Sequence, residues 1–173
     1  MQDAREPRCI GVNPVRTGYN AIADEWVGIT PGTDGLFILS LIHILFKAGK
    51  IDFEYLTRYT NAAFLINGSK NTENSGLFVR DKNGTPLVVD RQSGVLVPFD
   101  KVGVKPNITG SFSDKSGTHR TVFELMAEKY LSNEYSPAEV AKVIGINSDR
   151  IIKIANEIAT VAFEEEIIID QAW

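Results

Sequence analysis

Two short polar turns hold the residues whose types and spacing fit ligand chemistry. The first turn, Asn13-Pro14-Val15-Arg16-Thr17, follows a strand-like run, and the second, Gly32-Thr33-Asp34, precedes a long apolar helix. The first turn offers amide and hydroxyl groups and a guanidinium, which suits phosphate oxygens or a carbonyl edge. The second turn is expected to lie at a helix N-terminus, where unpaired backbone N–H groups favour a polar ligand.

Asp34 indicates which nucleotide would fit. A carboxylate accepts two parallel N–H bonds, and guanine is the base that presents such a pair. The sequence contains no GxGxxG or Walker-type phosphate loop, so an ordinary NAD or ATP fold is disfavoured. Taken singly, Asn-Pro and Pro-Gly-Thr-Asp are common turn and cap chemistry. Together, the two turns favour one site for a guanine nucleotide.

Composition limits the class of protein. The chain has 173 residues, 43% hydrophobic content and one cysteine, which excludes an intrachain disulfide framework and a local cysteine-rich metal site. The net charge of −4 argues against binding of a phosphate backbone as the main task. The apolar run 36–46 is too short to cross a bilayer and is typical of a buried helix. Residues 1–9 lack the apolar core of a signal peptide.

The elements that must position the two turns form an α/β pattern. Helices are predicted at 33–48, 53–59 and 118–131 and as a pair on either side of Gly145, where Ser136, Pro137 and Glu139 predict a capping box. Strands are predicted at 9–12, near 27–30 and at 166–171, with Cys9 as a small buried residue. Three short runs, 77–79, 87–89 and 95–97, predict a β-meander inserted at about residues 76–99.

These elements predict one domain over residues 1–173. Its parallel sheet should pair strand 9–12 with residues 167–169 as neighbours or near-neighbours, with the apolar helix on one face. Two buried strands are too few for a doubly wound sheet covered by helices. We therefore expect that other segments of a larger protein complete the sheet.

A helix-turn-helix DNA-binding regulator is the alternative hypothesis. The helices on either side of Gly145 resemble such a motif, and the second would offer Arg150, Lys153 and Asn156 to DNA. The same helix carries Asp149 and Glu157, and the acidic chain opposes the phosphate neutralisation on which DNA affinity depends. The sequence therefore favours a cofactor-binding protein that binds no nucleic acid.

The motifs together resemble one protein family. The stretch VNPVRTGYNAIADEWVGITPGTDG, the following FILSLIHILFKAGKIDFEYLTRYTN, and the later YSPAEVAKVIGINSDRIIKIANEIA and IIIDQAW are similar to the large subunits of molybdopterin oxidoreductases, the dimethyl sulfoxide reductase family. The resemblance covers nearly the whole chain. It implies an internal fragment of a Rossmann-like, three-layer domain with a short parallel sheet and helices on its faces.

The resemblance also implies a cofactor and a role for each turn. Family members hold a bis(molybdopterin guanine dinucleotide) with molybdenum or tungsten, and this region grips one guanosine end. The turn from Asn13 to Thr17 corresponds to ribose and phosphate contacts, and Gly32, Thr33 and Asp34 correspond to guanine contacts. Asn13 stands where many relatives have aspartate, and its amide still bonds a ribose hydroxyl.

The rest of the enzyme is expected outside this chain. The family's iron–sulfur cysteines, molybdenum ligand and final cofactor domain match nothing here, so the isolated chain is expected to be inactive. The implied partners are the remainder of the catalytic subunit, an iron–sulfur electron-transfer subunit, and a membrane anchor subunit. The implied parent enzyme is membrane-associated, on either the cytoplasmic or the periplasmic face.

Overall fold

The computed structural model describes residues 8–69, 73–115 and 117–165 and divides the chain into two compact units. Unit 1 comprises residues 1–50 and 130–173, and unit 2 comprises residues 51–129. The predicted mixed α/β class is confirmed, since the described residues form five α-helices and short sheets that include one parallel pair. The prediction of a single domain stays a prediction.

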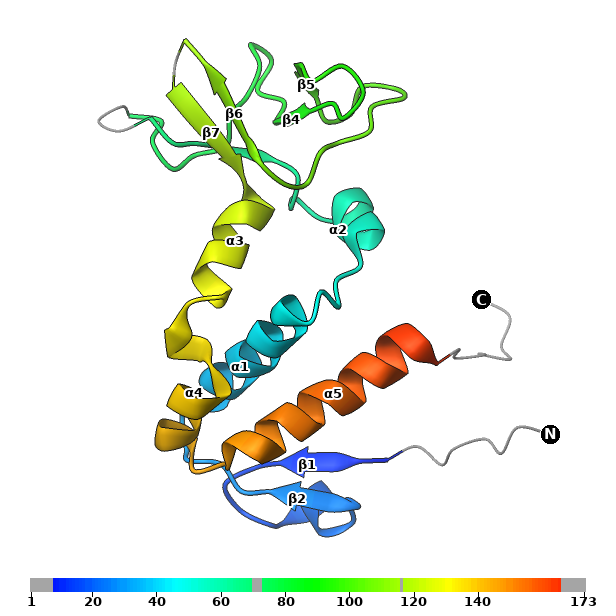
Figure 1. The fold of residues 1–173 in the computed structure, drawn as a ribbon, viewed down its shortest axis with the longest axis vertical. Helices are drawn as coiled ribbons and strands as arrows, with labels where there is room; N and C mark the ends of the chain where they lie inside the picture. Colours follow the sequence, from blue (N-terminus) through cyan, green and yellow to red (C-terminus); the bar gives the residue numbers. More distant parts are fainter. Residues whose placement is uncertain (1–7, 70–72, 116, 166–173) are drawn as a thin grey trace, which may run out of the picture. The chain divides into compact units, whose positions relative to one another are not determined.

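A parallel strand pair forms the sheet of unit 1 (Figure 1). Strand β1 (Ile10–Val12) pairs with β2 (Glu25–Val27), and Val12 lies opposite Val27. A 3-10 helix, η1 (Gly18–Ala21), lies in the connection between them. The strand predicted near residues 27–30 corresponds to β2, which begins two residues earlier, at Glu25. The predicted strand 166–171 and its pairing lie outside the described residues.

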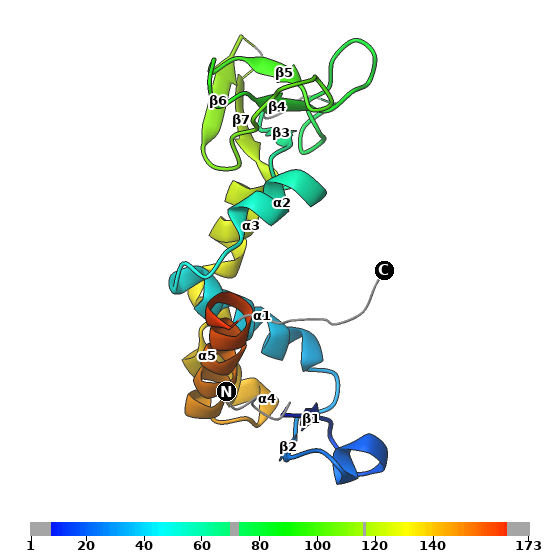
Figure 2. The ribbon, with the colours of Figure 1, turned by 90° about the vertical axis from the view of Figure 1, so that its right-hand side faces the viewer.

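Three helices pack against one another beside this pair. They are α1 (Asp34–Lys47), α4 (Pro137–Ile144) and α5 (Ser148–Glu164), with a 3-10 helix η2 (Asn133–Tyr135) before α4. Figures 1 and 2 show β1 and β2 beside α5 and α4 in this unit. Gly145 ends α4 with φ +77°, a left-handed conformation that glycine adopts without steric cost. Asn147 then caps α5 by accepting a hydrogen bond from the Asp149 N–H.

One apolar core joins the strand pair to the helices. It consists of buried residues from β2, α1, α4 and α5 and the segments beside them: Val27, Ile29, Phe37, Leu41, Val140, Ile144, Ile146, Ile151, Ile154 and Ala155. Four of these, Val27, Ile144, Ile151 and Ala155, have no exposed surface. Burial of such side chains is the main favourable term in folding. The loop that follows β2 is tied to this core, because the Thr30 N–H donates to the Ile144 carbonyl at 2.9 Å.

Unit 2 combines two helices with two antiparallel sheets. The helices are α2 (Phe53–Tyr59) and α3 (Val122–Tyr130), whose last residue belongs to unit 1. The larger sheet has the order β3-β7-β6, from β3 (Leu65–Asn67), β6 (Ser111–Asp114) and β7 (Gly117–Thr121). The smaller sheet pairs β4 (Leu87–Val89) with β5 (Leu96–Pro98).

The predicted meander is present in part. Strands β4 and β5 match the predicted runs 87–89 and 95–97. In the predicted run 77–79, Phe78 forms only an isolated antiparallel bridge to Ile66. The predicted start of a helix at residue 118 is wrong, because β7 occupies 117–121 and α3 starts at Val122. Among the described residues, no helix combines the length and apolar character needed to cross a membrane.

Candidate functional site

The first polar turn begins where β1 ends and is tied to β2. The Asn13 N–H donates to the Val27 carbonyl at 3.2 Å, and the Trp26 indole Nε1–H donates to the Asn13 carbonyl at 3.0 Å. The Asn13 side-chain oxygen accepts from the Val15 N–H at 3.1 Å, which closes an Asx turn. The backbone of the turn is therefore fixed at its first residue, and Pro14, Val15, Arg16 and Thr17 lie exposed after it.

The second polar turn leads from β2 into α1. Gly32 has φ +79° with open space where a Cβ would lie, and Thr33 occupies the predicted N-cap position. Its hydroxyl donates to the Thr30 carbonyl at 2.7 Å and does not cap the helix. Within the described residues, the N–H groups of Asp34, Gly35 and Leu36 consequently have no hydrogen-bond partner.

The parallel pairing of β1 and β2 brings the starts of both turns to one sheet edge. Asn13 follows β1 directly, and the segment to Asp34 leaves β2 at the opposite residue, Val27. The carboxyl ends of parallel strands are where open α/β sheets bind ligands. Both predicted turns therefore start from the same edge of the parallel strand pair.

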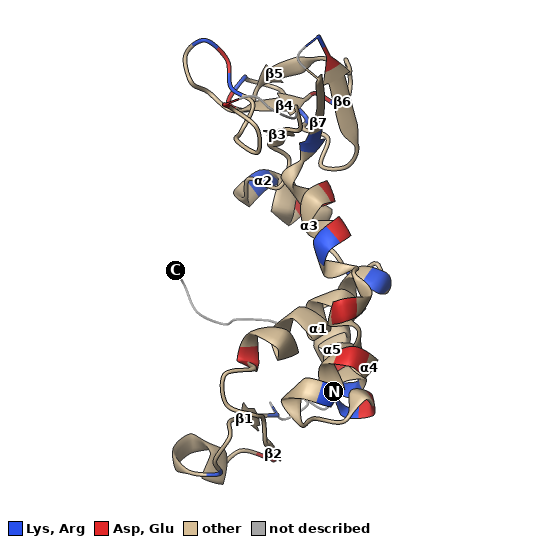
Figure 3. Ribbon diagram, turned by 90° about the vertical axis from the view of Figure 1, so that its left-hand side faces the viewer, with Lys and Arg blue, Asp and Glu red and all other residues tan. Residues whose placement is uncertain are grey.

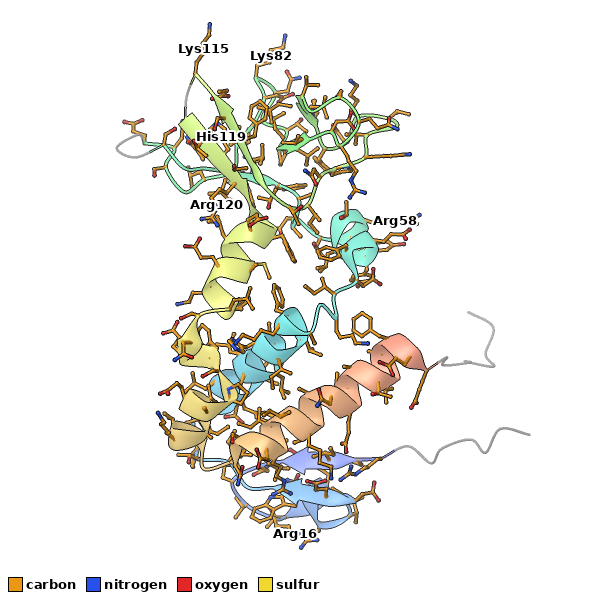
Figure 4. The ribbon with its side chains drawn as sticks, in the orientation of Figure 1. Arg16, Arg58, Lys82, Lys115, His119 and Arg120 are labelled. Carbon is orange, nitrogen blue, oxygen red and sulfur yellow. The ribbon has the colours of Figure 1, made fainter. Side chains whose placement is uncertain are left out.

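The charged groups of the two turns are open to a ligand. Figure 4 shows Arg16 projecting away from the ribbon of unit 1. Both Arg16 and Asp34 are exposed, and neither forms an ion pair or side-chain hydrogen bond with any described residue. A guanidinium and a carboxylate in this state can bind a phosphate and an N–H pair, respectively.

An ion-pair cluster beside the site was missed by the sequence reasoning. Arg150 of α5 donates from Nε to Glu25 at 2.9 Å and from Nη2 to the Trp26 carbonyl at 2.8 Å. Arg8 also pairs with Glu25. No local pattern signals this contact, since 125 positions separate its partners. This contact also argues against the DNA-binding hypothesis, because Arg150, which that hypothesis assigns to DNA, is hydrogen-bonded to β2.

Glu25 makes the stability of unit 1 depend on pH. The hydrogen bond from Arg150, aided by the nearby positive charges of Arg150 and Arg8, holds the pKa of Glu25 below its usual 4.5. A lowered folded-state pKa means that this stabilisation is present above pH 4.5 and is lost as the pH falls through the folded-state value. We expect Glu25→Gln to lose roughly 1–2 kcal/mol at pH 7 and to show a shallower acid loss than wild type. Urea denaturation at several pH values measures both, and parallel profiles would contradict the assignment.

The two histidines and the cysteine lie outside the two turns. His43 is buried on α1 and contacts the Tyr130 carbonyl through Nδ1 at 2.9 Å, as expected for a core residue. His119 lies in β7 with Nε2 at 3.2 Å from Asp114. Cys9 is exposed just before β1, so its predicted burial is wrong. No group of three or more His, Cys, Asp or Glu side chains in the described part of the chain could hold a metal.

Comparison with known proteins identifies the family. No family model matches the chain. A sulfite dehydrogenase subunit of Allochromatium vinosum is 35% identical over 98% of this chain and 18% of its own length. The formate dehydrogenase major subunit of Haemophilus influenzae is 28% identical over 87% of the chain and 14% of its length. The alpha subunit of perchlorate reductase of Dechloromonas aromatica is 24% identical over 79% of the chain and 19% of its length.

The three relatives are enzymes of one class and one family. All three are oxidoreductase subunits by name, and the chain spans less than a fifth of the length of each. They are molybdopterin oxidoreductases, and this chain belongs to that family. Members of this family share a molybdenum cofactor.

Proposed function

We propose that this chain is a cofactor-gripping part of the catalytic subunit of a molybdenum- or tungsten-dependent oxidoreductase. It would bind the guanosine end of a molybdopterin guanine dinucleotide through the two turns at the carboxyl ends of β1 and β2. The proposal rests on one observation: both turns start at the carboxyl ends of two paired parallel strands. The chain would not be catalytic alone.

The names of the relatives support a role in cofactor binding over substrate selection. They refer to three different substrates, sulfite, formate and perchlorate, yet all three share this region with the chain. A region common to enzymes of different substrates is best explained by what those enzymes have in common. For a molybdopterin oxidoreductase, that is the cofactor.

The residues of the two turns fit a guanosine diphosphate group. Arg16 would contact phosphate oxygens, and Asn13 and Thr17 would contact ribose hydroxyls, with Pro14 and Val15 shaping the turn between them. Gly32 leaves open space beside the helix start, where the unpartnered N–H groups of α1 and the Asp34 carboxylate would meet guanine. When bound, the molybdenum centre supplies the redox chemistry, and this chain only orients the nucleotide end.

The remaining parts of the enzyme belong to the proposal as well. An iron–sulfur cluster outside this chain, an iron–sulfur electron-transfer subunit, and a membrane anchor subunit follow from the family resemblance. We also propose that the parent domain is Rossmann-like and that further strands beside β1 or β2 complete its sheet.

Arg16→Ala tests the phosphate contact. We expect the variant to bind GDP and ADP about three- to tenfold more weakly than wild type, because one charge-assisted hydrogen bond is lost. Guanosine, which lacks phosphate, should bind both proteins equally. Calorimetric titration measures all three ligands, and Lys82→Ala, at an exposed lysine of unit 2, controls for the change in net charge. A loss of guanosine binding in Arg16→Ala, or equal weakening in Lys82→Ala, would refute the phosphate role.

A further inference from the structure

Unit 2 contains an open cavity that the proposed cofactor site does not use. Its volume is about 940 Å³, at the upper end of the roughly 300–1,000 Å³ typical of ligand sites. The lining comes from α2 and from the segments around β4 and β5. Buried Ala63 and Val88 contribute to its wall together with Phe53, Phe64 and Phe99. We call this cavity the basic groove because of its charges.

Three cations and one carboxylate line the basic groove. Arg58 comes from α2, Arg91 follows β4 and Lys105 follows β5, while Glu54 is the acidic residue among the lining. None of the three cations forms an ion pair with any described residue. Figure 3 shows the blue of a basic residue on α2, and Figure 4 shows Arg58 projecting from that helix. This excess of positive charge contrasts with the net charge of −4 of the chain.

A hydrogen-bond network fixes the loops that carry two of these cations. The Asp90 carboxylate accepts from the Ser93 hydroxyl at 2.6 Å and from the Lys105 N–H at 3.2 Å. The Arg91 N–H donates to the Lys105 carbonyl at 2.8 Å. The bonds from Ser93 and Lys105 hold the pKa of Asp90 below its ordinary value. The backbone at both cations is therefore arranged before any ligand binds.

Exposed aromatic side chains lie beside these cations. Phe53, Tyr59 and Phe99 line the groove with 42%, 63% and 44% of their surface exposed. Exposed aromatic residues next to arginine are typical of protein interaction surfaces. The exposed walls suit an extended segment better than an enclosed small molecule. An occupant must therefore supply both apolar groups and negative charge.

We propose that the basic groove binds an acidic peptide segment of a partner protein, with its aromatic or aliphatic side chains against Phe53 and Phe99 and its carboxylates facing Arg58, Arg91 and Lys105. The charge of the groove and its exposed apolar walls carry this assignment. It is independent of the cofactor site in unit 1, so either proposal can fail without the other.

The test uses the full 173-residue chain and two synthetic peptides. One peptide alternates glutamate and phenylalanine, and the other has lysine in place of each glutamate. We expect NMR titration to show binding of the acidic peptide alone, with shifts at the residues that line the groove. Arg58→Gln, Arg91→Gln and Lys105→Gln should each raise the Kd about two- to fivefold, as expected for partly exposed ion pairs.

Two exposed lysines of the same unit serve as matched controls. Lys82→Gln and Lys115→Gln remove the same charge as Lys105→Gln at positions outside the groove (Figure 4), and we expect both to leave the Kd unchanged. Equal binding of the two peptides, or equal weakening by the control variants, would overturn the proposal. Equally tight binding of an oligothymidylate would also overturn it, because the groove would then bind any polyanion.

Discussion

Asp34→Ala should remove the preference for guanine nucleotides. Wild-type chain is expected to bind GDP weakly but more tightly than ADP, because a carboxylate that accepts two N–H bonds is left unpaired by adenine. Loss of two charge-assisted hydrogen bonds should weaken GDP binding roughly ten- to a hundredfold and leave ADP binding nearly unchanged. Competition binding with both nucleotides measures the selectivity ratio directly.

Asp149→Ala is the matched control for this experiment. Asp149 is also an exposed carboxylate in the first turn of a helix, and its loss changes the net charge equally. The control should keep the preference for GDP. If Asp34→Ala keeps that preference as well, Asp34 does not contact guanine, and its role is limited to the start of α1.

The second large effect concerns the core that holds the two turns. Ile151→Ala should lower the free energy of unfolding by about 2–5 kcal/mol, because Ile151 is fully buried between the helices and its loss leaves a cavity. Ile152→Ala changes the same side chain at the next position of α5, where 39% of the isoleucine surface is exposed. Both substitutions alter helix propensity equally, so their difference measures burial.

Urea denaturation of both variants measures this difference. The exposed-site control is expected to stay within about 1 kcal/mol of wild type. Equal destabilisation by the two substitutions would contradict the placement of α5 on α1, α4 and the strand pair.

Helices with strong end signals could be predicted from the sequence. The predicted helix 53–59 matches α2, and its cap is confirmed by the hydrogen bond from the Tyr55 N–H to Asp52 at 2.8 Å. Pro137 starts α4 and Gly145 ends it as expected. The capping box is wrong, because Ser136 makes no side-chain cap and Glu139 pairs with Lys142 at 2.7 Å. A surface cation thus competes successfully for the carboxylate.

Strands β6 and β7 of unit 2 were not predicted, because polar residues occupy most of their positions. Strand β7 reads GTHRT, and its inward residues are His119 and Thr121. Strand β6 reads SFSD and has one apolar residue, Phe112. Neither strand shows the alternation of apolar and polar residues on which strand prediction depends. Their pairing depends on contacts between strands that the local pattern does not encode.

For the candidate site, the sequence predicts residue types but not all of their contacts. The positions of both turns, after β1 and before α1, agree with the prediction. The Thr33 hydroxyl bonds backward to Thr30, and Arg150 reaches Glu25 from a distant helix. Side-chain direction and long-range pairing require the folded chain, so these contacts lay beyond the sequence.

The central claim is that the two turns bind the guanosine end of the cofactor, and an NMR titration of the wild-type chain with GDP and ADP tests it most directly. We predict that GDP shifts the backbone amides of residue 13, residues 15–17 and residues 32–36 and that ADP at the same concentration shifts them less. Equal shifts for both nucleotides, or shifts that cluster near Arg150 and Lys153 and spare Asn13 and Asp34, would contradict the claim.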